Sequence, residues 1–180
     1  MSPQPRRAEA TASEFGRIYE DHVWRVYGFL AYRGADPLLA EDLTQATFER
    51  ALRAFSRFDP RRGSELSWLL TIARNLLVDH RRGERAILID PLDTRLDSAI
   101  AGPEARFSGS PELVEALAQL DERDREVLAL RFGGDLSGAE IAAVTGLTLA
   151  NVQQITSRAL RRLRWWLAQT PQGEDVRSPR

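Results

Sequence analysis

The sequence predicts an all-α protein made of two small helical domains joined by a flexible acidic linker. Apolar residues recur at helical spacing along most of the chain, and no segment has the alternation or β-branched enrichment that strands show. Between residues 89 and 109 this period is interrupted by Pro91, Gly102, Pro103 and Gly109, and acidic residues outnumber basic ones. With 180 residues, of which 43% are hydrophobic and 28% charged, the chain is long enough and apolar enough to build two such cores.

The first domain, residues 13–86, is expected to contain three helices. The first helix runs from about residue 13 to residue 32, and Gly34 follows it as a helix-ending glycine. Asp36 and Pro37 are an N-cap and first-turn pair for a second helix that extends to about residue 58. The third helix runs from about residue 64 to residue 82, with Gly83 just beyond it.

The second domain, residues 111–169, follows the linker at residues 87–110. Two helices are predicted to begin near residue 110 and near residue 121. Ser137 and Glu140 have the spacing of a capping box for a short helix that Gly146 ends, and Thr148 caps a long final helix that reaches about residue 168. A short helix, a tight turn and a longer helix in this order form a helix-turn-helix.

The final helix is predicted to have one face that packs and one that stays free. At 100° per residue the apolar side chains gather on one side, and the opposite side carries Asn151, Gln153, Gln154, Ser157, Arg158 and Arg161. Amide side chains can bind adenine in a bidentate manner, and arginines can bind guanine or phosphate. No Asp or Glu occurs between residues 141 and 173, so this end is locally basic. This face is therefore a candidate surface for recognising DNA bases. The alternative interpretation is that it is an ordinary solvent-exposed helix surface.

Composition argues against several other classes of protein. The chain has no cysteine, which excludes disulfides, catalytic thiols and Cys-based metal sites. Its only histidines, His22 and His80, lie on separate helices without a paired metal-ligand spacing, so we expect no metal, no cofactor and no enzymatic activity. No apolar run approaches the roughly 20 residues of a membrane span, so we expect a cytoplasmic protein without membrane insertion.

Five short segments together resemble one protein family. These are AEDLTQATF (residues 40–48), WLLTIARN (68–75), DHRR (79–82), LDERDREVL (120–128) and EIA (140–142). In this order, with a linker between the third and the fourth, they resemble extracytoplasmic-function (group IV) RNA polymerase sigma factors over about residues 15–167. The resemblance implies an alternative sigma factor that binds core RNA polymerase and directs promoter-specific transcription initiation.

The resemblance also implies roles for individual residues. It assigns polymerase binding to Asp42, Leu43, Gln45 and Phe48, with Leu43 and Phe48 mainly in the core. It assigns recognition of the −10 promoter element to Phe58, Asn75, Asp79, Arg81 and Arg82. It assigns recognition of the −35 element to Thr148, Asn151, Gln153, Gln154, Ser157, Arg158 and Arg161. The implied partners are core RNA polymerase, through its β′ and β subunits, promoter DNA and an anti-sigma factor.

One departure and one alternative accompany this interpretation. Many members of the family have basic residues directly after the position of Val152, where this chain has Gln153, Gln154 and Ile155, so the bases that each residue reads do not transfer. The alternative function is a stand-alone helix-turn-helix transcriptional regulator. Such a protein binds a duplex operator without polymerase, whereas a sigma factor depends on polymerase.

Overall fold

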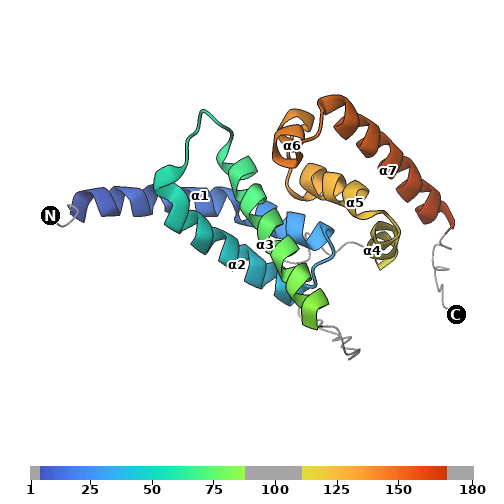
Figure 1. Cartoon of the computed structure of the whole chain (residues 1–180), viewed down its shortest axis with the longest axis horizontal. Coiled ribbons are helices and arrows are strands. Elements are labelled where there is room, and N and C mark those ends of the chain that lie inside the picture. Colours follow the sequence, from blue (N-terminus) through green and yellow to red (C-terminus); the bar gives the residue numbers. More distant parts are fainter. Residues whose placement is uncertain (1–4, 88–110, 170–180) are drawn as a thin grey trace, which may run out of the picture.

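The computed structural model describes residues 5–87 and 111–169, and all regular elements in these two ranges are helical (Figure 1). The N-terminal unit comprises α1 (Pro5–Tyr32), α2 (Pro37–Ala54), a 3₁₀ turn (Phe55–Arg57) and α3 (Glu65–Ile87). The C-terminal unit comprises α4 (Pro111–Ala118), α5 (Glu122–Leu128), a π-helical turn (Ala129–Gly133), α6 (Gly138–Thr145) and α7 (Leu149–Gln169). The all-α prediction is confirmed, while the predicted linker, residues 87–110, lies outside the described ranges except for Ile87, which ends α3.

Local capping signals fix most helix ends where the sequence predicts them. The side chain of Asp36 accepts a hydrogen bond from the backbone N–H of Leu39 at 3.0 Å, which caps α2. Ser137 and Glu140 form both halves of the capping box of α6. Gly146 ends α6 with a φ of +73°, in the left-handed region that glycine adopts without steric cost. The contacts of Ser137 and Glu140 fix the start of α6, and Gly146 fixes its end and therefore the turn between α6 and α7.

Three helix boundaries differ from the prediction. α1 begins at Pro5 rather than near residue 13, since proline suits the first helical position and the residues after it include good helix formers. α2 ends at Ala54, and the chain tightens into a 3₁₀ turn before Phe58. α3 continues through Gly83 to Ile87, because a helix tolerates one glycine where no left-handed cap is formed.

The two units pack against each other through one continuous apolar core. Phe29 and Leu30 of α1 belong to the same buried cluster as Leu69 and Leu70 of α3, and as Leu130 beyond α5. The members from the C-terminal unit are Val127, Ala129, Leu130, Leu136, Ile141, Val152 and Ile155. A second, smaller cluster joins α4, α5 and α7 through Ala116, Leu120, Leu128, Ala159 and Leu163. The larger cluster makes the contact between units part of the hydrophobic core.

Backbone meets backbone at the centre of this contact, where the π-helical turn lies against α1. A Cβ atom at Gly133 would lie 2.6 Å from the carbonyl oxygen of Gly28, a distance that no side chain tolerates. A Cβ atom at Gly134 would lie 2.6 Å from Cδ1 of Leu70. Glycine at residue 133 is therefore required for the units to approach this closely.

The turn of the helix-turn-helix provides a stability test. We expect Gly146→Ala to lower the free energy of unfolding by about 1–2 kcal/mol, because a side chain disfavours the left-handed backbone. Gly146→Asn should cost less, since asparagine visits this conformation more readily. Nothing lies within 4 Å of a Cβ atom at this residue, so neither variant creates a clash. Urea unfolding followed by circular dichroism measures both, and equal losses would show that the backbone conformation is not the cause.

Candidate functional site

The predicted polymerase-binding residues lie on α2 beside an apolar groove. Asp42 and Gln45 are exposed, whereas Leu43 and Phe48 are buried, as the division into contact and core residues predicts. The Nε2 of Gln45 donates to Oε1 of Glu49 at 3.1 Å. The arrangement gives α2 a polar edge above a hydrophobic interior.

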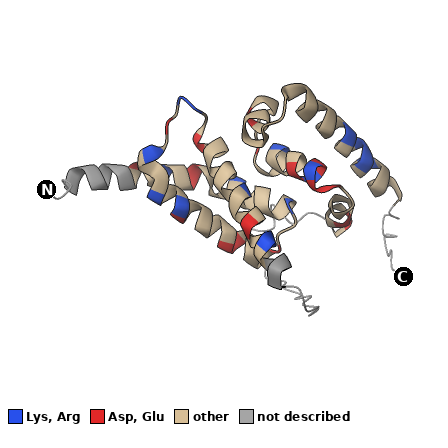
Figure 2. Cartoon of the chain, in the orientation of Figure 1, with Lys and Arg blue, Asp and Glu red and all other residues tan. Residues whose placement is uncertain are grey.

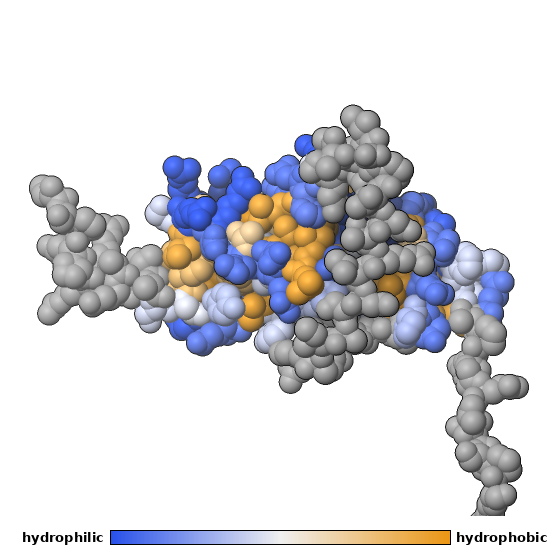
Figure 3. Space-filling view, turned by 90° about the horizontal axis from the view of Figure 1, so that it is seen from below, coloured by the Kyte–Doolittle hydropathy of each residue, from blue (hydrophilic) through white to orange (hydrophobic). Residues whose placement is uncertain are grey.

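The groove between α1 and α2 was missed by sequence reasoning. Its volume is about 640 Å³, and Gln45, Phe48 and Leu52 of α2 line it together with side chains of α1. Tyr19, Trp24 and Leu52 remain 47%, 42% and 51% exposed, so large apolar side chains face solvent here. Figure 3 shows hydrophobic surface among hydrophilic residues on the side that carries the N-terminal unit. The signal in the sequence is that α1 carries more large apolar residues than one packing face needs.

The residues that the resemblance assigns to the −10 element separate into two groups. Asn75, Asp79 and Arg82 are exposed on α3. Arg81 is engaged instead by the C-terminal unit, because its Nη1 lies 2.6 Å from Oε1 of Glu122. Three of these four side chains on α3 are therefore accessible to solvent, and the fourth, that of Arg81, is paired with Glu122.

Phe58 lies at a small cavity in front of α3. Its ring packs on that of Trp68, with the ring centroids 4.9 Å apart. The cavity has a volume of about 290 Å³ and is lined by Phe58, Asp59, Ser67, Trp68 and Thr71, among others. Its wall is completed by Ala143 and Val144 of α6, from the other unit, while Asn75 does not line it. The structure thus does not bring Phe58 and Asn75 into one cavity.

The outer face of α7 carries the residues predicted to read the −35 element. The hydroxyl of Thr148 accepts from the backbone N–H of Asn151 at 3.2 Å, so Thr148 caps the helix as predicted. The remaining members of this face, Asn151, Gln153, Gln154, Ser157, Arg158 and Arg161, are exposed. Val152, Ile155, Ala159 and Leu163 are buried on the opposite face. Figure 2 shows arginines and no acidic residue along this helix.

Arg158 differs from its neighbours on this face, because it forms an ion pair with Asp124 of α5. Two guanidinium nitrogens reach the two carboxylate oxygens, and the Nε to Oδ2 distance is 3.2 Å. Asp124 is fully buried, so this contact holds α7 to α5. The hydrogen bond and the charge of Asp124 raise the pKa of Arg158 above its ordinary value. Arg161 lies one turn further along α7 and forms no such ion pair within the described residues.

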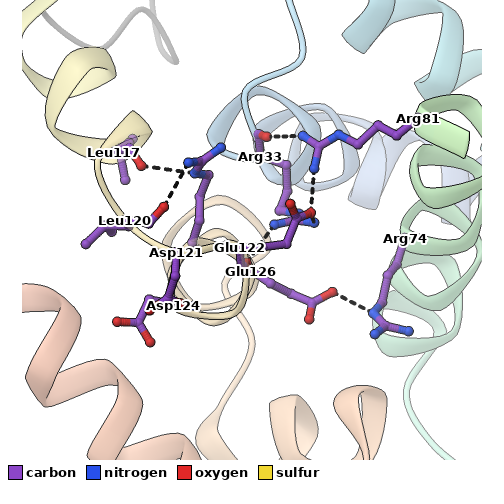
Figure 4. A network of polar contacts seen from close by, with 10 residues as sticks. Arg33, Arg74, Arg81, Leu117, Leu120, Asp121, Glu122, Asp124 and Glu126 are labelled. Carbon is purple, nitrogen blue, oxygen red and sulfur yellow. Dashed lines mark hydrogen bonds and ion pairs between the residues drawn. The ribbon is translucent and has the colours of Figure 1, made fainter. Parts of the chain in front are cut away.

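A network of charged residues joins the two units on the inner side of α3 (Figure 4). Arg33 is 2% exposed, and its Nη2 lies 2.7 Å from Oε1 of Glu122. The same carboxylate binds Arg81, whose Nη2 also donates to the carbonyl oxygen of Arg33 at 2.6 Å. A second pair joins Nε of Arg74 to Oε1 of Glu126 at 2.6 Å. Sequence reasoning assigned none of these contacts.

Burial sets the electrostatics of this network. Loss of water around the guanidinium lowers the pKa of Arg33, although its hydrogen bond with Glu122 opposes the shift. Burial by itself raises the pKa of Glu122, but the hydrogen bond from Arg33 and the charges of Arg33, Arg81 and Arg125 outweigh it and lower the pKa overall. Arginine stays protonated in proteins, and the lowered pKa of Glu122 favours its charged form, so the two charges compensate each other.

Two family models match this chain, one in each unit. The model described as Sigma-70 region 2 matches residues 18–87, and that described as Sigma-70, region 4 matches residues 116–164. The ECF RNA polymerase sigma factor SigK of Mycobacterium ulcerans is 32% identical over 168 residues, which cover 87% of this chain and 87% of SigK. The chain belongs to the ECF RNA polymerase sigma factors.

Another relative and a solved structure agree with this assignment. The ECF RNA polymerase sigma factor BldN of Streptomyces coelicolor is 36% identical over 163 residues, covering 87% of this chain but 62% of BldN. The structure of CnrH in complex with the cytosolic domain of CnrY has a TM-score of 0.64 at 27% identity, covering 89% of this chain and 94% of CnrH. This sigma factor acts in promoter-specific initiation with RNA polymerase, and the stand-alone regulator is not supported.

Within the described part of the sigma factor, no helix has both the length and the apolar character needed to cross a bilayer. The same residues contain no cluster of three or more acidic or histidine side chains able to hold a metal ion.

Arg33 offers a test of how the charged network contributes to stability. We expect Arg33→Met to change the free energy of unfolding by less than about 1 kcal/mol, because it fills the same space and removes a buried charge, while Glu122 keeps Arg81 as a partner. Its Nε also has no hydrogen-bond partner, so one unsatisfied donor disappears. Arg33→Ala should cost about 2–4 kcal/mol through the cavity it leaves.

Denaturant unfolding of the two Arg33 variants separates packing from charge. A loss in Arg33→Met as large as that in Arg33→Ala would mean that the ion pair, rather than the volume of the side chain, stabilises this contact.

Proposed function

We propose that this sigma factor divides its work among three surfaces. The polar edge of α2, with Asp42 and Gln45, binds the β′ subunit of core polymerase, and the adjoining groove extends that contact. The observation that supports this division best is that exposed members of the three predicted sets lie in separate places, on α2, on α3 and on the outer face of α7. The protein acts in the cytoplasm, performs no covalent chemistry and needs no cofactor.

The −10 element is read by α3 and by the segment that precedes it. Asn75 accepts and donates hydrogen bonds to an unstacked base, and Arg81 and Arg82 bind the phosphates of the melted strand. Phe58 and Trp68 supply aromatic surface beside a cavity of about 290 Å³. An exposed amide, aromatic rings and cations in one region are the groups that hold single-stranded DNA.

The −35 element is read by α7 in the major groove. Asn151, Gln153 and Gln154 occupy the first turns of the helix, where base edges are reached in helix-turn-helix proteins. Arg161 follows on the same face and contacts guanine or phosphate. Thr148, at the N-terminus of α7, is positioned to contact a backbone phosphate. The β subunit holds this unit on the polymerase.

An anti-sigma factor is the regulatory partner that we propose. The apolar groove between α1 and α2 exposes Tyr19, Trp24 and Leu52, which suits a partner that buries hydrophobic side chains next to the polymerase-binding edge. CnrH has itself been solved with the cytosolic domain of another protein bound. A partner in this groove competes with polymerase for Gln45.

Run-off transcription with purified core polymerase on a pool of genomic promoters tests the proposal. Discrete start sites that depend on the protein, with shared −35 and −10 motifs upstream, are expected. Asp42→Ala should weaken co-elution with core polymerase, whereas Asn75→Ala should leave it intact and reduce open complexes detected by permanganate footprinting. Both residues are exposed, so folding is unaffected, and Glu20→Ala on α1 serves as an exposed control. Identical defects in the two variants would contradict the division of labour.

The two arginines of the outer face provide a matched pair on α7. Arg161→Ala should weaken binding of the holoenzyme to the −35 duplex by about tenfold, within the roughly 1–3 kcal/mol of a base contact, and leave the melting temperature unchanged. Arg158→Ala should lower the melting temperature, since Asp124 loses a charged partner. Fluorescence anisotropy on the mapped promoter and thermal unfolding measure the two effects. An unchanged melting temperature in Arg158→Ala would show that its pair with Asp124 is not structural.

A further inference from the structure

We propose that the −35 element read by this sigma factor is rich in A·T base pairs. The inference rests on the proposed function, in which α7 enters the major groove, and it names the bases that the helix selects there. The observation that carries it is the chemistry of the first two turns of α7. Their exposed side chains are amides or apolar groups, and no arginine of α7 lies among them.

The first two turns of α7 therefore present no charge to a DNA groove. The exposed residues among positions 149–155 are Leu149, Ala150, Asn151, Gln153 and Gln154. The three amide groups form no hydrogen bond within the part of the chain that the structure describes, so their donors and acceptors are free. Helix-turn-helix proteins contact base edges with the N-terminal residues of the second helix. The bases of the −35 element therefore meet these five side chains.

An amide side chain is complementary to adenine in the major groove. Its N–H group donates to N7 of adenine, and its carbonyl oxygen accepts from the N6 amino group. Guanine presents two acceptors at the same edge, N7 and O6, so the amide oxygen would lie against an oxygen without a donor between them. Arginine, which has only donors, is the side chain that fits guanine. Asn151, Gln153 and Gln154 therefore favour adenine over guanine, by roughly tenfold for each contact that forms.

Leu149 and Ala150 add a preference for thymine. Leu149 is a large apolar residue, yet it is 46% exposed at the first position of α7. A Cβ atom at Gly138 would lie 3.0 Å from Cδ1 of Leu149, so glycine at the start of α6 leaves room for this side chain. In the major groove thymine presents a methyl group, which apolar side chains contact. Because thymine pairs with adenine, the apolar and the amide side chains favour the same base pairs.

Two arginines beside this face of α7 are engaged within the C-terminal unit. Arg158 places two guanidinium nitrogens on the carboxylate of Asp124, which is fully buried. Arg131 lines a hollow of about 290 Å³ together with Gln153, but its Nη1 donates to the carbonyl oxygen of Leu136 at 2.8 Å. A guanine contact by either arginine would have to compete with these hydrogen bonds. Arginine–guanine pairs are therefore disfavoured where the amides meet the bases.

Arg161 is exposed on the same face but lies too far along the helix to replace the amides. It is about 18 Å beyond Leu149 at the rise of an α-helix. The major groove is about 12 Å wide, so a side chain at this distance reaches the phosphates at its edge when the first turns of α7 are at the bases. Arg161 therefore strengthens binding to any sequence, whereas the amides select bases.

Selection of promoter DNA by the holoenzyme tests the base preference. Core polymerase carrying this sigma factor is bound to duplex promoters that have a fixed −10 element and a randomised −35 region, and the bound DNA is sequenced. The unmodified protein is expected to enrich A·T pairs in the −35 region. Gln153→Arg should change the preference at one base pair from adenine to guanine. Gln169→Arg is the matched control, because it makes the same substitution at an exposed residue at the other end of α7 and should leave the preference unchanged.

Modified bases test the individual contacts. At the base pair that Gln153→Arg affects, 7-deazaadenine lacks the N7 acceptor and should weaken binding of the unmodified holoenzyme by roughly tenfold, with little effect on Gln153→Ala. Uracil in place of thymine lacks the methyl group, and it should weaken binding of the unmodified holoenzyme more than that of Leu149→Ala. Arg161→Ala should lower the affinity for all members of the library alike. Fluorescence anisotropy measures these affinities.

Enrichment of G·C pairs in the −35 region by the unmodified protein would overturn this inference and leave the proposed function intact. Equal base preferences in Gln153→Arg and Gln169→Arg would also overturn it, because the amide would then not face a base. Failure of the proposed function gives a different result, a selection that enriches no base in the −35 region. In that case α7 does not read the promoter, and the inference fails with it.

Discussion

The close approach of the π-helical turn to α1 determines how the rest of the molecule is arranged. Glycine at residue 133 lets two backbones meet without intervening side chains, and this places α5 directly beside α1 and α3. Leu130 and Leu136 then enter the core of the N-terminal unit. The acidic residues of α5 come to lie opposite arginines only because this apolar contact fixes the orientation of the helix. Packing therefore provides both the attraction and the orientation, and the ion pairs form between the side chains that it brings together.

The buried guanidinium of Arg33 depends on that arrangement. A charged side chain at 2% exposure is unfavourable unless it is paired, and its partner, Glu122, comes from the other unit. Glu122 also binds Arg81, so one carboxylate is shared by an arginine at the end of α1 and one on α3. Separation of the units would return Arg33 to water, whereas the side chain of Glu122 is already 60% exposed. The network therefore adds directionality to the contact between the units.

Local rules were enough to predict the helix caps and the two faces of α7, because each depends on residues close in sequence. Asp36, Ser137 and Gly146 are examples, and so is the burial of Val152 and Ile155. The same rules could not predict which polar faces are covered. Arg81 and Arg158 both lie on outward faces of their helices when each helix is considered alone, yet each is paired with α5. These partners are 41 and 34 residues away in sequence, so helical periodicity contains no information about them.

The ion pairs between the units also bear on the charge balance of the chain. A formal net charge of −1 is unusual for a DNA-binding protein, yet the acidic residues are not spread evenly along the chain. α7 has none, whereas Glu122 and Glu126 on α5 are directed at the arginines of α3. The packed units therefore neutralise arginines of α3 internally, whereas the outer face of α7 stays basic. In the proposed function each surface contributes only part of the affinity for DNA, and attachment to polymerase raises the effective concentration of both at one promoter.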